Sequence, residues 1–252
     1  MSTKKSKKKI LVVAAIIAGA LAVVAGVSFA IAHNNKLANG GGGGEGGSDD
    51  DDCMCAPPPG VKECSNCDPG MDYKPIIYLY PTAEAKITVK LGYPELITAE
   101  YPSYKSGWSV IAKPDGTLKI GEKEYYALYY ESKNKVVPQK TDTGFVVKSD
   151  DVSRFLEEKL SILGLNERES EEFIIYWLPK LQKKDYVYIR FATNDEIAKN
   201  MPLKITPEPD TTIRVLMLWQ GLDKSETVKE QALAPVARNG YTAVEWGGTE
   251  LK

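Results

Sequence analysis

Three charged side chains lie inside otherwise apolar segments of the sequence, and they are the residues best placed to take part in chemistry. Arg190 lies in YVYIRF, Arg214 in TIRVLMLW and Glu245 in TAVEWGG. Strand alternation places each of them on a face shared with apolar or aromatic neighbours, where an unpaired charge costs several kcal/mol. We therefore expect Glu245 to pair with at least one of the two arginines, either as a structural bridge or as the polar floor of a pocket.

Glycoside hydrolysis is the enzymatic reaction that the sequence leaves open. It needs two carboxyl groups about 5 to 10 Å apart and no imidazole. The chain has a single histidine, His33, which excludes Ser-His-Asp and Cys-His hydrolases downstream. Glu131, at the end of an apolar segment, and Glu245 form the candidate carboxylate pair. Aromatic rings beside them either stack on sugars or belong to the core.

Other catalytic signatures are weak or absent. Asp142-Thr143-Gly144 matches the catalytic triplet of aspartic proteases, in which the triplet ends a hydrophobic strand. Here a proline and polar residues precede it, so we interpret it as a turn leading into the next strand. The sequence contains no GxSxG or P-loop motif. We therefore expect no cofactor, and a binding protein rather than an enzyme.

Four cysteines cluster within residues 53–73, which we call the cysteine-rich collar. They are spaced C-x-C and C-x-x-C on either side of a proline-rich turn, as Cys53, Cys55, Cys64 and Cys67. Outside the cytosol this clustering favours two disulfides paired crosswise. A four-thiolate metal site and free redox thiols are the alternatives.

An uncharged apolar run covers residues 10–32. As a helix rising ~1.5 Å per residue, it is long enough to cross a hydrocarbon core of ~30 Å. The lysine-rich residues 1–9 precede it, so the positive-inside rule places the N-terminus in the cytoplasm and the C-terminal part outside. We expect a single-pass signal-anchor in the cell membrane. The alternative is a signal peptide cleaved after Ala30-Ile31-Ala32.

The segment that follows the apolar run, residues 33–52, is rich in glycine and ends in four consecutive aspartates. It cannot bury enough apolar area to fold, which predicts a disordered linker. All 34 acidic residues follow the apolar run, whereas five of the 32 basic residues precede it. This acidic balance argues against nucleic acid as a partner.

The aromatic residues locate the folded domain. All of them except Phe29 lie between Tyr73 and Trp246, so we expect the domain to cover residues 74–252. Residues 85–91 alternate as in a half-buried antiparallel strand, whereas residues 75–80 and 124–131 are apolar on both faces, as in central strands.

The order of the elements predicts the fold class. Pro114-Asp115-Gly116 predicts a hairpin turn. Helical spacing starts at Asp150 and again at Asn166, whose Glu169 completes a capping box, and Pro179 should kink or end the second helix. Strands resume after the helices. We expect an α+β domain with a mostly antiparallel sheet and a central helical hairpin on one face, preceded by the transmembrane helix and tether.

Several separated segments resemble a family of uncharacterised bacterial exported or membrane-anchored proteins. They are KPIIYLYP, YPSYKSGWSVIAKPDGTL, FIIYWLPKL, PDTTIRVLM and EWGGTEL, in this order. The resemblance covers about residues 74–250. It implies the domain boundary and the exported location, and it implies no activity, ligand or catalytic residue.

Two functions from different classes follow from the sequence. The favoured one is a tethered extracytoplasmic module that binds a cell-envelope polymer, such as a glycan, or a protein partner. A rigid β-rich domain on a long flexible linker is better suited to binding a ligand than to catalysing a reaction. The alternative is a carboxylate-dependent glycoside hydrolase acting outside the cell. A deep cleft with two facing carboxylates would support the hydrolase, and a flat aromatic or charged face would support the binder.

Overall fold

The computed structural model describes residues 71–252. The predicted transmembrane helix, the linker and the four cysteines of the collar lie outside these residues. Within residues 71–252, no helix is both long enough and apolar enough to span a membrane.

The larger of two sheets has eight strands in the order β12-β8-β9-β11-β13-β1-β7-β3. The bounds are β1 Met71–Tyr80, β3 Ile97–Tyr101, β7 Leu128–Lys133, β8 Thr143–Lys148, β9 Tyr186–Phe191, β11 Thr211–Leu222, β12 Lys229–Glu230 and β13 Thr242–Glu250. Neighbouring strands are antiparallel except for the parallel pairs β11 with β13 and β12 with β8. The strand β1 begins at Met71, slightly before the expected boundary at Lys74.

The smaller sheet has five strands in the order β10-β2-β4-β5-β6. Their bounds are β2 Ala85–Leu91, β4 Trp108–Ala112, β5 Leu118–Ile120, β6 Lys123–Tyr125 and β10 Leu203–Thr206. The predicted hairpin joins β4 to β5. In its turn Gly116 has a φ of 86°, and the Thr117 amide donates to the Asp115 carboxylate at 2.9 Å. The single sheet expected from the sequence is therefore wrong, since the domain has two.

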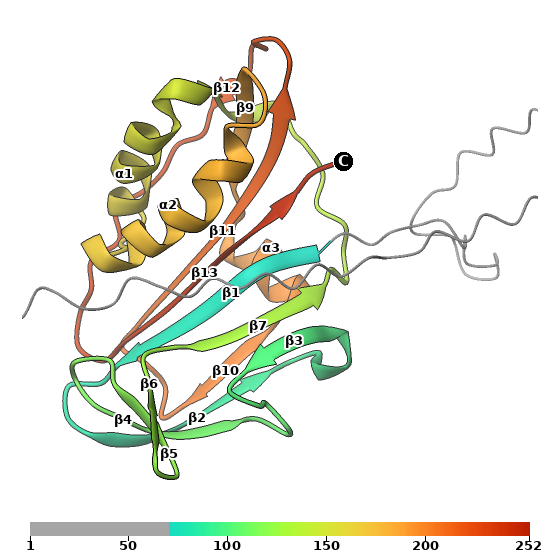
Figure 1. Ribbon diagram of the computed structural model, residues 1–252. Coiled ribbons are helices and arrows are strands. Elements are labelled where there is room, and N and C mark those ends of the chain that lie inside the picture. The colour runs from blue at the N-terminus through green and yellow to red at the C-terminus, as the bar shows by residue number, and fades with distance from the viewer. Residues whose placement is uncertain (1–70) are drawn as a thin grey trace, which may run out of the picture. The chain divides into compact units, whose positions relative to one another are not determined.

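The helices and the smaller sheet cover opposite faces of the larger sheet (Figure 1). The helices α1, Val152–Ile162, and α2, Glu167–Leu181, lie side by side over one face, where Trp177 and Trp246 are fully buried. On the other face the smaller sheet packs around Trp108, and the short helix α3, Asn194–Asn200, packs beside it. The domain is thus α+β, with mostly antiparallel sheets and three helices within the described residues.

The local predictions succeed and fail for identifiable reasons. The capping box of α2 is confirmed, because Asn166 accepts from the Glu169 amide and the Glu169 carboxylate accepts from the Asn166 amide. Pro179 lies inside α2, which ends soon afterwards at Leu181. The first helix begins later than expected, because residues 149–151 form a 3-10 turn. Residues 124–131 are not one strand, since the chain passes from β6 in one sheet to β7 in the other.

Candidate functional site

A buried ion pair joins two central strands of the larger sheet. Arg214 on β11 lies directly across from Glu245 on β13, and its Nε donates to the carboxylate at 2.5 Å. The same guanidinium donates to the Met201 carbonyl at 2.8 Å, and the Tyr130 hydroxyl donates to Glu245 at 2.7 Å. The arginine and glutamate side chains are 9% and 6% exposed. The prediction that Glu245 meets an arginine is confirmed.

Asp72, near the start of β1, extends this polar cluster. Thr249 on β13 donates to its carboxylate, and the Asn134 amide, oriented with its nitrogen toward Asp72, donates at 2.8 Å. Burial raises the pKa of Asp72 to about 7, against the lowering effect of the Thr249 hydrogen bond and with a further rise from the charge of Glu245. Asp72 was missed in the sequence because it precedes the expected boundary.

The polar cluster has no room for a substrate. The void against Asp72, Tyr130 and Glu245 has a volume of about 10 Å³. A single water molecule needs about 10 to 15 Å³ of such volume. The cluster is therefore a structural network, in which each buried charge is held by a partner.

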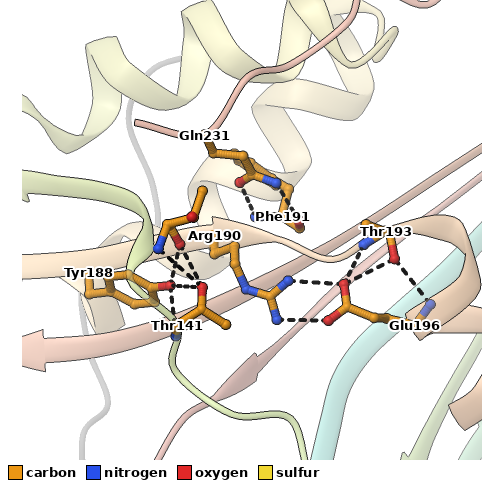
Figure 2. Close-up of polar contacts among 8 residues, drawn as sticks. Thr141, Tyr188, Arg190, Phe191, Thr193, Glu196 and Gln231 are labelled. Atoms are coloured by element: carbon orange, nitrogen blue, oxygen red, sulfur yellow. Dashed lines mark hydrogen bonds and ion pairs between the residues drawn. The ribbon is translucent and has the colours of Figure 1, made fainter. Parts of the chain in front are cut away.

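The second arginine, Arg190 on β9, has a different partner. Its guanidinium makes two hydrogen bonds to Glu196 on α3, at 2.9 and 3.0 Å (Figure 2). Burial alone would raise the pKa of Glu196, but hydrogen bonds from Arg190 and Thr193 outweigh it and lower that pKa. Thr193 and Glu196 form the capping box of α3, so this ion pair attaches the short helix to the sheet. Arg190 therefore does not join the cluster around Glu245.

The carboxylate pair proposed for glycoside hydrolysis is not brought together. Tyr130 and Glu245 lie on the face of the larger sheet that packs against the smaller sheet. Glu131, the next residue after Tyr130, points to the opposite face, where it affects the ionisation of Tyr129 and of Tyr176 on α2. Because the sheet separates Glu131 from Glu245, the two carboxylates cannot flank one glycosidic bond.

The face that carries Glu131 displays a row of tyrosines, which we call the tyrosine strip. Its members on this face are Tyr73 on β1, Tyr101 on β3, Tyr129 on β7 and Tyr176 on α2. The fifth member, Tyr125 on β6, belongs to the smaller sheet, packs against the core between the sheets and joins the strip at its edge through Tyr101. The helices cover the part of the sheet from β8 to β1, where Ile76 and Tyr78 are buried beneath them, whereas β7 and β3 extend beyond them (Figure 1). Tyr73 and Tyr101 are exposed, and the other three tyrosines are partly buried, so part of each residue is accessible to solvent.

The tyrosine strip is continuous from one element to the next. Tyr101 lies across from Tyr129 in the β3 and β7 ladder and is 63% exposed. The Tyr101 ring meets the Tyr125 ring edge-on, with centroids 5.6 Å apart. At the other end, Tyr129 lies across from Ile76 of β1, and Tyr176 packs against the core cluster that contains Ile76. The strip therefore runs across three strands of the larger sheet and onto α2.

Two lysines adjoin the tyrosine strip at Tyr176. The Lys74 ammonium lies 5.1 Å from the centre of the Tyr176 ring, and the Lys180 ammonium lies 3.6 Å from it. Lys180 also donates to the Tyr176 carbonyl at 3.1 Å. Burial lowers the pKa of Lys180, and the positive charges of Lys183 and Lys74 lower it further, while Glu131 opposes this effect. We call Lys74 and Lys180 the lysine pair.

A groove with a volume of about 730 Å³ lies between β8, α1 and the segment before β12. Most of its carboxylates are already in ion pairs, namely Asp151 with Arg154, Glu158 with Lys159 and Glu226 with Lys140. The groove therefore offers no pair of free facing carboxylates. In the part of the chain that the structure describes, no cluster of His, Cys, Asp and Glu side chains is arranged to hold a metal ion.

The comparisons with known proteins do not decide between the candidate functions. No protein-family model, curated protein or solved structure matches this chain. The residues of this domain therefore carry the functional argument. Sequence reasoning missed the tyrosine strip because residues 124–131, with the adjacent pairs Tyr125-Tyr126 and Tyr129-Tyr130, resemble a strand covered on both faces. The signal available was the choice of tyrosine, whose hydroxyl suits a wet surface.

Proposed function

We propose that this domain is a glycan-binding module that takes a polysaccharide chain of the cell envelope along the tyrosine strip. The observation that carries the proposal is the row of exposed and partly exposed tyrosines along the edge of the larger sheet and onto α2. Aromatic faces bind the apolar faces of sugar rings, and tyrosine hydroxyls remain available for hydrogen bonds. Because the strip lies on paired strands and a helix, the rings are held in place before the ligand arrives.

The composition of the strip favours a glycan over a protein partner. Protein interfaces usually have an apolar centre surrounded by a polar rim. The strip instead alternates tyrosine rings with Glu131 and the lysine pair. The large aliphatic side chains that are most exposed among the described residues lie elsewhere: Ile175 is 67% exposed beside the groove between α1 and α2, and Val136 is 53% exposed near α3.

The N-terminal sequence supports the same function. With residues 10–32 as a membrane anchor and residues 33–52 as a flexible linker, the domain would be held outside the cell on a leash. A flexible linker would let the tyrosine strip reach different parts of the envelope, and tethering would raise the effective concentration of the polymer around it. Separation of Glu131 from Glu245 leaves the hydrolase alternative without the residues that it requires.

A glycan array probed with the full-length protein in detergent tests the proposal, and the best polysaccharide is then titrated by calorimetry. Tyr101→Ala and Tyr129→Ala should each weaken binding by about tenfold, because a well-packed aromatic contact contributes on the order of 1.4 kcal/mol. Tyr186→Ala, at the start of β9 on the opposite face, is the matched control and should leave binding unchanged.

Two results would contradict this function. One is binding that the strip variants do not weaken. The other is steady release of new reducing ends from the bound polysaccharide, which would require a hydrolytic site.

A further inference from the structure

We infer that the glycan is anionic and contains uronic acid units, whose carboxylates bind the lysine pair while their sugar rings contact Tyr129 and its neighbours. This inference rests on the proposed glycan-binding function and specifies its ligand. Its basis is the way the fold places Lys74 next to Lys180 at the edge of the tyrosine strip.

The backbone at Lys74 is unusual. Its φ of 55° lies in the left-handed region, which non-glycine residues rarely adopt. The register of β1 shifts between Tyr73 and Ile76 against β13 and between Asp72 and Ile76 against β7, so Lys74 lies in a bulge. Bulges redirect side chains, and strained residues concentrate at functional sites. Here the bulge holds the Lys74 ammonium over Tyr176.

The placement of Lys74 brings like charges together. Lys180 lies over the same Tyr176 ring, and Lys183 follows it in the sequence. The lowered pKa of Lys180 reflects its burial and then the repulsion from Lys183 and Lys74. Glu131 counteracts this repulsion at Lys180, but the pKa of Lys180 remains lowered. A strained backbone that holds lysines close together is most simply explained by a bound anion.

The tyrosines beside the lysine pair indicate which anion. The Tyr176 ring lies under the two ammonium groups, so Tyr176 is a positioning residue, and the partly exposed Tyr129 is the ring that we propose stacks on a sugar. In a hexuronic acid the carboxylate is bonded directly to the sugar ring. One sugar unit can therefore stack on Tyr129 and present its carboxylate to the lysine pair. In a phosphodiester-linked polymer the charge lies between units, away from the stacked ring.

The matched probes are polygalacturonate and its fully methyl-esterified form, which share one sugar backbone and differ in charge. The full-length protein in detergent should bind polygalacturonate at least tenfold more tightly than the ester at low salt. This preference should shrink between 50 and 500 mM salt, since charges on an exposed surface are screened over about 8 Å at 0.15 M.

The variants separate the charge of the lysine pair from the fold. Lys74→Gln and Lys180→Gln should each weaken binding to polygalacturonate by up to about fivefold and leave the ester unaffected. Lys74→Arg should retain the preference. Lys74→Gly should raise the melting temperature, because glycine tolerates the positive φ, and still lose affinity. Lys204→Gln, on an exposed position of β10, is the control.

The outcomes distinguish the two proposals. If both polymers bind equally through Tyr129 and the Lys74→Gln/Lys180→Gln variant changes nothing, the uronate inference is wrong and the glycan-binding function stands. If a polyglycerol phosphate polymer binds more tightly than polygalacturonate, the assignment to uronic acid is also wrong. If no polysaccharide binds, or Tyr129→Ala has no effect, the proposed function fails together with the inference.

Discussion

The buried pair of Arg214 and Glu245 gives the sharpest prediction of stability. The Arg214 and Glu245 side chains are 9% and 6% exposed. They lie on the neighbouring strands β11 and β13 at the centre of the larger sheet. Removing one partner of a buried pair leaves an uncompensated charge and costs about 3 to 5 kcal/mol. Glu245→Gln keeps a carbonyl oxygen that can still accept from Arg214 or Tyr130, so we expect the lower end, about 3 kcal/mol.

Arg214→Met should cost more, because the Glu245 carboxylate then keeps only the hydrogen bond from Tyr130. We expect about 4 kcal/mol from this loss. The double variant Arg214→Met/Glu245→Gln contains no unpaired charge at this position. Its cost should therefore be smaller than the sum of the single costs by about 2 kcal/mol or more.

Urea denaturation of the four proteins, followed by tryptophan fluorescence, measures these free energies of unfolding. Arg154→Met is the control, because Arg154 pairs with Asp151 at the surface with side-chain exposures of 80% and 50%. It should change stability by less than about 0.5 kcal/mol. Single variants within about 1 kcal/mol of the wild type, or strictly additive costs, would refute the reasoning. Glycan binding lost in a stable Glu245→Gln protein would show that the cluster is a site after all.

Three further predictions concern other parts of the chain. The pKa of Asp72 is about 7 in the folded state, against a usual value of 3.8, so the free energy of unfolding should fall between pH 4 and pH 7 by at most about 4 kcal/mol. Urea denaturation at several pH values should show a weaker dependence of this free energy on pH for Asp72→Asn. The same pH dependence in both proteins would contradict this. Glu169 is fully buried and accepts two hydrogen bonds from Arg238. Glu169→Ala should therefore lower the free energy of unfolding, measured in urea, by about 3 kcal/mol or more. A loss below about 1 kcal/mol would show that the pair is dispensable. Replacing all four collar cysteines by serine should leave the melting temperature of the domain almost unchanged, because its core clusters are formed by residues 76–251; a fall of many degrees would mean that the collar packs into the fold.

Local patterns were sufficient for the elements whose signals are complete within a short segment. The Asn166 and Glu169 spacing located the start of α2. The cost of an unpaired buried charge indicated that Glu245 meets an arginine, and the structure identifies Arg214 as that arginine. The helix α3 was missed because its seven residues are too few to show a repeating helical pattern of apolar positions. Its capping box, Thr193 with Glu196, was the available signal, and without it the partner of Arg190 could not be identified.

Contacts between distant segments could not be predicted in the same way. Alternation says that residues 85–91 have one buried face, and it does not say which sheet they join. The partners of Asp72 are Asn134 and Thr249, which are far apart in the sequence and meet only through the register of β1 with its neighbours. Exposure of the tyrosine strip depends on where the helices end over the sheet, a property of packing rather than of the strand sequence.

The two faces of β7 connect the structural cluster with the proposed binding surface. Tyr130 points to the buried cluster, whereas Tyr129 and Glu131 point to the tyrosine strip. On β1, Asp72 is fixed by Thr249 immediately before the bulge, and regular pairing resumes at Ile76 after it. A residue with positive φ persists only where its surroundings determine the backbone on both sides. The buried network therefore holds the bulge in place, and the bulge in turn keeps the Lys74 ammonium at Tyr176. Asp72→Ala, which loosens this network, should therefore weaken the proposed preference for polygalacturonate over its methyl ester, measured in the same titrations.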